Sequence, residues 1–182
     1  MIKPPPGTDG PFVAADVHYL DEGKARAAMV AASDRRFSMI ISSRTVIVPA
    51  DVPYRPGELY LRELPPLRAI IPATGDLALI VVDGYADLDP AGRPGLGTRV
   101  FAEFGVPVIG VAKTAFRTAT HAAKVIRGQS SRPLYVTAAG MTVADAADLV
   151  SGMAGQFRVP DALKRADRLA RGLEPPDAVP AG

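Results

Sequence analysis

The chain of 182 residues contains no cysteine and only two histidines, His18 and His121. Without cysteine it can form no disulfide, no thiolate zinc site and no cysteine nucleophile, and a reducing compartment is its natural setting. Two histidines are too few for a metal site rich in imidazole. If a metal ion binds, oxygen atoms must therefore supply its ligands.

Long apolar runs and an excess of one charge are missing as well. No stretch approaches the roughly 20 apolar residues of a membrane-spanning helix, and no basic-then-apolar leader opens the sequence. We therefore expect a cytoplasmic protein without a membrane partner. Lysine and arginine total 21 against 19 acidic residues, a formal net charge of +2. This balance permits a nucleic-acid partner without requiring one.

The length suits a single domain with a full core. Three consecutive prolines near the start predict a disordered lead-in over residues 1–10, and the proline-rich end predicts a disordered tail over residues 172–182. The single domain is expected to span residues 11–171.

Apolar patterns separated by short polar turns predict most of the secondary structure. Strands are expected at residues 12–20, 24–32, 37–48, 77–82, 107–112 and 134–137. Helices are expected at residues 57–70, 96–104, 142–155 and 161–171. Pro65 and Pro66 should end or kink the first helix near Leu64. The basic segment 114–132 fits a surface hairpin or helix, or else a rim that binds a nucleic-acid backbone.

A carboxylate follows the most apolar of these strands. Residues 77–82 read as a strand that is buried on both faces, and Asp83 and Gly84 come directly after it. Open α/β sheets bind ligands at the carboxyl ends of their strands, so Asp83 is the first candidate for chemistry. Asp–Gly is also a common turn, and that role alone would equally explain the pair.

The order of the elements predicts an α/β, ribonuclease-H-like fold. We expect a mixed sheet of five or six strands, three antiparallel and then parallel ones, with helices on both faces. In this topology the first strand lies beside the fourth, which would place Asp16 next to Asp83. Two close carboxylates repel unless a cation lies between them, and Mg²⁺ binds such groups together with phosphate oxygens and water. Glu63 on the intervening helix would add a third carboxylate.

Plainer interpretations exist for each of these residues. Asp16 would be satisfied by backbone donors, Glu63 would be an exposed helix residue, and Lys113 would only reach into solvent from the end of its strand.

Five blocks of the sequence, in this order, resemble the endonuclease V family. They are DVHY with Asp16, PYRPGELYLRE with Glu63, VVDG with Asp83, GVPVIGVAK with Lys113, and FRVPDALKRAD near the end. Each block alone is a weak motif, but their joint order is far more specific. The resemblance covers residues 12–171, which is nearly the whole expected domain.

The resemblance implies a Mg²⁺-dependent endonuclease, with Mn²⁺ as a substitute, that nicks DNA or RNA 3′ to inosine. In DNA this step starts repair. By match to the family's blocks, Asp16, Glu63 and Asp83 would be catalytic and hold the metal, and Lys113 would lie near the scissile phosphate. We expect the protein to be a monomer.

The resemblance also implies residues that contact the nucleic acid. Tyr54 would be part of the wedge that fills the helix where the altered base is rotated out. The pocket for that base would be shaped by Gly57, Leu59, Gly84 and Gly95.

Two of the chain's departures from the family's pattern bear on the site. Asp89 stands where the family commonly has the histidine of a His-Pro-Arg-Arg run, and Asp89 is therefore a possible extra site residue. Residues 138–143 read AAGMTV, where the family has a Gly-His pair. Two alternatives stay open: a catalytically weak or inactive endonuclease V-like nucleic-acid-binding protein, and a metal-dependent enzyme for a small phosphorylated substrate.

Overall fold

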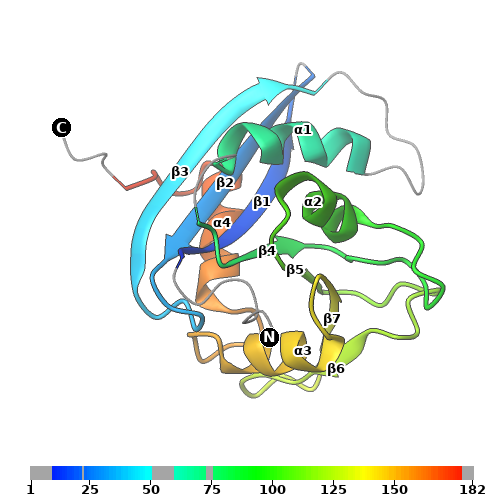
Figure 1. The fold of residues 1–182 in the computed structure, drawn as a ribbon. Helices are drawn as coiled ribbons and strands as arrows, with labels where there is room; N and C mark the ends of the chain where they lie inside the picture. Colours follow the sequence, from blue (N-terminus) through cyan, green and yellow to red (C-terminus); the bar gives the residue numbers. More distant parts are fainter. Residues whose placement is uncertain (1–9, 22, 51–59, 73–75, 178–182) are drawn as a thin grey trace, which may run out of the picture.

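The structure, a computed structural model, describes residues 10–21, 23–50, 60–72 and 76–177. Within these ranges a single sheet is flanked by helices on both faces (Figure 1). The strands are β1 (Phe12–Leu20), β2 (Lys24–Ala32), β3 (Ile40–Pro49), β4 (Leu79–Asp83), β5 (Val108–Ala112), β6 (Ala123–Val125) and β7 (Leu134–Ala139). The helices are α1 (Tyr60–Ile70), α2 (Leu96–Phe104), α3 (Val143–Gly152) and α4 (Asp161–Ala170).

The sheet order is β3-β2-β1-β4-β5-β7-β6. Short turns make β1, β2 and β3 antiparallel neighbours, as the sequence predicted. β4 pairs in parallel with β1, and β5 pairs in parallel with β4. The expected mixed sheet, with the first strand beside the fourth, is therefore confirmed.

The last strands differ from the prediction of a parallel continuation. β7 runs antiparallel to β5, and β6 runs antiparallel to β7. No helix lies between β5 and β7, so the chain lacks the crossover that a parallel pair requires. The described residues thus form seven strands instead of five or six. β6 was missed because a three-residue edge strand leaves almost no periodic pattern.

Helix α1 corrects the expected effect of its two prolines. The helix continues through Pro65 and Pro66 to Ile70 instead of ending near Leu64. Each proline removes a backbone donor at a typical cost of about 3 kcal/mol. Pro66, Leu67 and Ile70 are buried, and Leu67 and Ile70 belong to the apolar cluster between the helix and the sheet. This burial offsets the cost of the prolines.

β3 begins at Ile40, three residues later than predicted. The Asp34 carboxylate accepts hydrogen bonds from the backbone N–H groups of Arg36, Ser38 and Met39, which builds a tight turn. Within this turn Phe37 has φ 55 and is buried edge-on against Phe12. Phe37, which seemed to start the strand, instead packs into the core from the turn.

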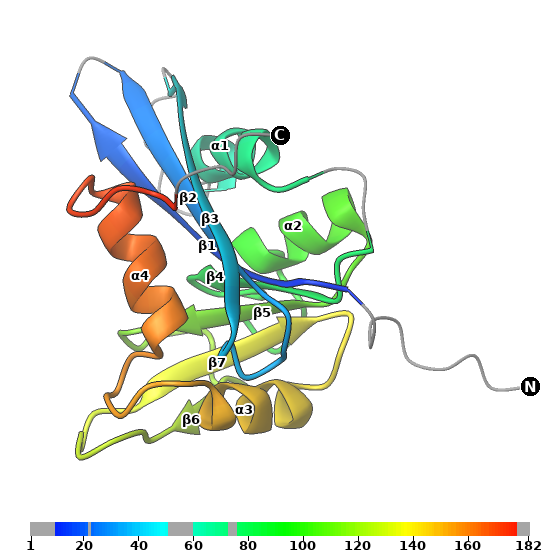
Figure 2. The same cartoon turned by 90° about the vertical axis from the view of Figure 1, so that its left-hand side faces the viewer.

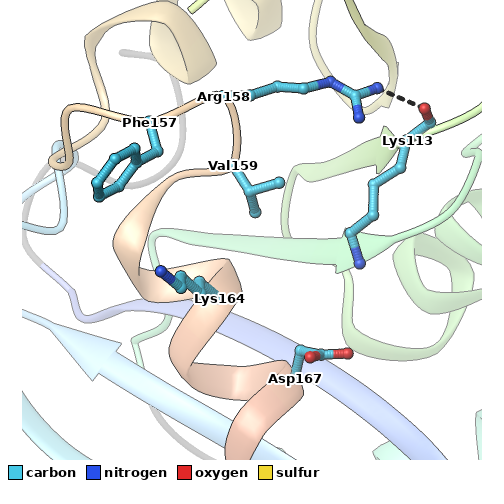
Figure 3. Close-up of a pocket in the computed structure, with 6 residues that line it drawn as sticks. All are labelled: Lys113, Phe157, Arg158, Val159, Lys164 and Asp167. Atoms are coloured by element: carbon cyan, nitrogen blue, oxygen red, sulfur yellow. Dashed lines mark hydrogen bonds between the residues drawn. The ribbon is translucent and has the colours of Figure 1, made fainter. Parts of the chain in front are cut away.

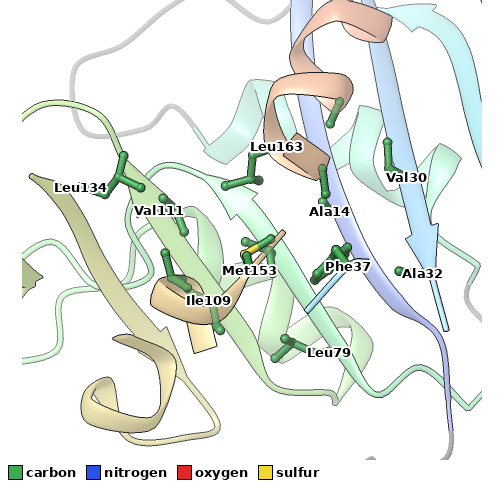
Figure 4. Close-up of a cluster of buried hydrophobic side chains, with 14 of the residues drawn as sticks. Ala14, Val30, Ala32, Phe37, Leu79, Ile109, Val111, Leu134, Met153 and Leu163 are labelled. Carbon is green, nitrogen blue, oxygen red and sulfur yellow. The ribbon is translucent and has the colours of Figure 1, made fainter. Parts of the chain in front are cut away.

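Two apolar clusters lie on opposite faces of the sheet. Alternating side chains of each strand divide between them, as Ala14 and Val13 of β1 do. The cluster shown in Figure 4 is completed by α3 and α4, and the other by α1 and α2. Figure 2 shows α4 on one side of the sheet and α1 and α2 on the other.

Contacts at the carboxyl terminus continue past the expected domain boundary at Arg171. The backbone N–H of Asp177 donates to Ser43 Oγ of β3 at 2.8 Å, and Arg165 of α4 forms ion pairs with Glu174 and Asp177. The remaining residues of the expected lead-in and tail, 1–9 and 178–182, lie outside the described residues.

Gly110 of β5 holds open the space for the loop that follows Asp83. A Cβ atom there would lie 2.5 Å from the backbone nitrogen of Ala86 and 2.7 Å from the carbonyl oxygen of Gly84. We expect Gly110→Ala to lower the free energy of unfolding by about 1–3 kcal/mol, measured by urea denaturation. Gly152→Ala is the control, because a Cβ at Gly152 meets nothing within 4 Å. Equal stability of the two variants would contradict this account.

Candidate active site

Asp16, Asp83 and Lys113 project from one face of the sheet. Ala15 pairs with Val82, so Asp16 and Asp83 stand one step further along adjacent parallel strands. Asp83 pairs with Val111, and Lys113 follows two residues later. Because side chains alternate along a strand, all three share the face that α4 covers. The predicted meeting of residues 16 and 83 is thus built into the strand register.

Asp83 and Lys113 form an ion pair. Lys113 Nζ donates to Asp83 Oδ2 at 2.5 Å. Burial lowers the pKa of Lys113, but the hydrogen bond and charge of Asp83, with the charges of Asp16 and Asp167, raise that pKa above its usual value. The ammonium group is therefore charged at neutral pH.

Asp16 and Glu63 are carboxyl groups that resist ionisation. Burial, followed by the charge of Asp83, raises the pKa of Asp16 to about 7, although the Val17 N–H donates to its Oδ1 at 2.9 Å. Burial, followed by the charges of Asp16 and Asp83, raises the pKa of Glu63 in α1 to about 8. Acidic groups from two strands and a helix thus interact at one place, where the charge of Asp83 opposes the ionisation of Asp16 and Glu63.

Asp167 of α4 joins this cluster and was not singled out from the sequence. Its charge raises the pKa of both Asp16 and Lys113. Figure 3 shows Asp167 and Lys113 around the same pocket. A signal was present, because Asp167 lies in the apolar stripe of α4 formed by Leu163, Ala166 and Ala170. A carboxylate on a buried helix stripe needs a reason to be there.

Two arginines fix the segments around the cluster. Arg158 donates to the carbonyl oxygens of Lys113 at 2.5 Å and Pro133 at 2.7 Å, and the first of these bonds is drawn in Figure 3. Arg127 is 6% exposed and donates to carbonyl groups of the α3–α4 linker, including those of Met153 and Phe157. Arg127 therefore anchors a loop and is not part of a solvent-facing rim.

The loop after β4 holds three further predicted site residues. Gly84 has φ 129, and Gly95 is buried against the backbone of Tyr85 and Ala86. Asp89 accepts a hydrogen bond from the Arg93 N–H at 3.0 Å and also forms an ion pair with that side chain. Asp89 is therefore engaged in its own turn. Contacts of Gly84, Gly95 and Asp89 with nucleic acid stay predictions.

The other predicted contact residues, Tyr54, Gly57 and Leu59, lie outside the described residues.

The chemistry of the cluster fits a hard divalent ion, but the spacing does not form a closed site. In the described part of the chain, no three His, Asp or Glu side chains are grouped closely enough to hold a metal ion. The acidic groups nevertheless interact electrostatically, and all of their donor atoms are oxygen. Such donors suit Mg²⁺, and side-chain movements would have to complete the ligand set.

The comparison with protein families settles the relationship. The endonuclease V family model matches residues 10–168. The chain belongs to the endonuclease V family. It is therefore related to nucleases that act on nucleic acid.

Individual endonuclease V proteins agree with this membership. Endonuclease V of Streptomyces avermitilis is 30% identical over 92% of this chain and 82% of its own length. The crystal structure of endonuclease V from the same organism has a TM-score of 0.75 at 26% identity, covering 93% of this chain and 83% of that one.

A more distant structural relative shares the fold. Endonuclease V of Ciona intestinalis has a TM-score of 0.74 at 20% identity, covering 90% of this chain and 84% of that one. Its structure is a complex of a variant with DNA that contains an inosine followed by a ribo-adenosine.

The sequence predicts no helix that could cross a membrane. Among the described helices, none has the length and apolar character needed to cross a bilayer.

The raised pKa values predict how stability depends on pH without metal. A carboxyl group with a higher pKa in the folded than in the unfolded protein binds its proton more tightly when folded. The usual values are 3.8 for Asp16 and 4.5 for Glu63. In EDTA the free energy of unfolding should therefore fall as pH rises from about 4 through about 8.

Urea denaturation across this pH range measures the slope. Glu63→Gln should flatten it, because one of the shifted groups is removed. Glu103→Gln is the control, since the hydrogen bond from Arg68 lowers the pKa of Glu103 and moves its titration to more acidic pH. Parallel slopes for wild type and Glu63→Gln would refute this origin of the pH dependence.

Proposed function

We propose that this protein is a Mg²⁺-dependent endonuclease that nicks nucleic acid 3′ to deaminated bases, inosine in particular, in DNA repair or on RNA. The observation that carries the proposal is the cluster of Asp16, Glu63 and Asp83 beside Lys113. Burial and neighbouring carboxylate charges raise the pKa values of Asp16 and Glu63, so a bound cation would favour the ionised form of both groups. The inosine-containing DNA bound by the similar Ciona intestinalis protein supports the substrate class.

The acidic cluster would hold the metal through Asp16, Asp83 and Glu63, with Asp167 close by on α4. When bound, a divalent ion activates water and relieves negative charge on the leaving oxygen. The protein contributes the placement of the carboxylates, because β1 and β4 fix two of them and α1 brings the third. Their partial burial would strengthen their attraction for a bound cation.

Lys113 would act on the phosphate as a charged hydrogen-bond donor. The hydrogen bond and charge of Asp83 keep the ammonium group of Lys113 protonated. Arg158 donates a hydrogen bond to the backbone carbonyl oxygen of Lys113 at 2.5 Å. If Asp83 were to hold a metal ion, the ammonium group of Lys113 would be available to donate to a phosphate oxygen. Developing negative charge in the transition state would then strengthen this hydrogen bond.

Nicking of inosine-containing oligonucleotides tests the proposed activity. With Mg²⁺ or Mn²⁺, the wild type should cut single- or double-stranded DNA or RNA near inosine, and EDTA should abolish the cut. Asp83→Ala should remove activity, because the cluster loses its central carboxylate. Asp148→Ala is the control, since Asp148 is exposed on α3, near the other end of the strands. Products are resolved on denaturing gels against uracil, abasic and unmodified substrates.

Three outcomes separate the hypotheses. Undiminished cutting by Asp83→Ala would count against the proposed site. Binding of the oligonucleotides by wild type without nicking under either ion would favour the weak or inactive nucleic-acid-binding alternative. If the wild type neither bound nor nicked the oligonucleotides, the nuclease proposal would be overturned. An enzyme for a small phosphorylated substrate would then remain.

Lys113→Met tests the role of the ammonium group separately. It should lower the single-turnover rate by roughly 100- to 1,000-fold, as the loss of a donor to developing charge typically does. Oligonucleotide affinity should change much less, because the interaction strengthens only in the transition state. A loss confined to affinity would assign Lys113 to substrate binding instead.

A further inference from the structure

A pocket of about 290 Å³ opens beside the candidate active site. It is lined by Lys113, Phe157, Arg158, Val159, Lys164 and Asp167, which Figure 3 shows around a common space. Lys113 and Asp167 also belong to the charged cluster described above. A group bound in this pocket would therefore lie next to the scissile phosphate. The volume is at the small end for ligand pockets and suits one compact group.

Phe157 offers this pocket an aromatic surface. The residue is 55% exposed, although its backbone is held in place. Arg127 donates to the Phe157 carbonyl at 3.0 Å and to the carbonyl groups of Met153 and Gly155. An exposed ring on an anchored loop can stack on a flat group without first being ordered, so little conformational entropy is lost on binding.

Lys164 adds a positive charge to the same surface. Its ammonium nitrogen lies 5.1 Å from the centre of the Phe157 ring, and Figure 3 shows the side chain directed toward that ring. A ring for stacking together with a nearby ammonium group matches the two halves of a nucleotide, a flat base and an anionic phosphate. Asp167 lies on the same helix, and its negative charge would repel a phosphate bound at the Lys113 end of the pocket. The phosphate of the nucleotide is therefore expected at Lys164.

We propose that this pocket is a subsite for one nucleotide that flanks the cut, whose base stacks on Phe157 while Lys164 binds its phosphate. The inference rests on the proposed nuclease function and adds a contact distinct from the expected pocket for the altered base. Stacking on a ring reads no base edge, so the subsite should accept any base. It would position the strand across the charged cluster.

Oligonucleotide binding tests the stacking contact independently of cleavage. The probes are fluorescein-labelled single-stranded DNA oligonucleotides that contain one inosine, with an abasic site placed in turn at each position that flanks the nick. Fluorescence anisotropy gives their affinities with Ca²⁺ and, separately, with EDTA. Phe157→Ala should weaken binding of the intact probe by roughly 5- to 100-fold, the range of base–aromatic stacking. Phe157→Trp should retain binding.

The position of the stacked base follows from combining the two changes. At one flanking position, an abasic site should lower the affinity of wild type for the probe as much as Phe157→Ala lowers it for the intact probe. In Phe157→Ala the same abasic site should lower the affinity little further. Met39→Ala is the control, since Met39 is 65% exposed in the β2–β3 turn at the opposite end of the strands. It should bind like wild type at every position.

Lys164→Gln tests the phosphate contact. In plots of log affinity against log salt concentration it should reduce the slope by about 0.7, the value for one phosphate contact on a single strand. Arg35→Gln removes an equal charge from the β2–β3 turn and should leave the slope unchanged.

The results distinguish this subsite from the nuclease proposal. The subsite alone would be overturned if Phe157→Ala bound the intact probe as tightly as wild type. It would also be overturned if the abasic site lowered the affinity of Phe157→Ala as much as that of wild type at every position. Position-specific coupling without nicking under Mg²⁺ or Mn²⁺ would retain the subsite and overturn the nuclease. No binding of any probe by wild type under either condition would overturn both.

Discussion

Repulsion among partly buried carboxyl groups is the constraint around which this protein is arranged. Asp16 and Glu63 are shielded from water and face the charge of Asp83, so each makes ionisation of the next more costly. The parallel pairing of β1 with β4 keeps them together, and Lys113 offsets one of the charges. A folded protein retains such opposed groups at a cost in stability, which a bound cation would relieve.

The surroundings of this cluster depend on hydrogen bonds to backbone carbonyl groups. Arg127 and Arg158 use their guanidinium groups mainly to hold loops and the end of β5, which ties the α3–α4 linker to the edge of the sheet near Lys113. This arrangement presents Phe157, Lys164 and Asp167 opposite Lys113. The anchored linker therefore connects the acidic cluster to the surface on which a strand of nucleic acid would lie.

Local patterns predicted the elements that depend on local chemistry. β1 and β2 have the expected bounds, α2 ends at Gly105 with a left-handed cap, and Thr142 caps α3 by accepting the Asp145 N–H. The prediction was wrong where tertiary packing outweighs a local rule. α1 passes through Pro65 and Pro66 because burial of its apolar face offsets their cost.

The sequence by itself determined which acidic residues and which lysine form the cluster, and that the first strand lies beside the fourth. The physical reason is that apolar runs define the strands, and the order of the strands decides which strand ends lie together. Only the tertiary structure decided that Asp167 approaches Asp16 and Lys113, and that Arg127 is buried instead of facing a ligand. These relations join residues that are far apart in the chain. They depend on how α4 and its linker pack against the sheet, and no local pattern of residues encodes that packing.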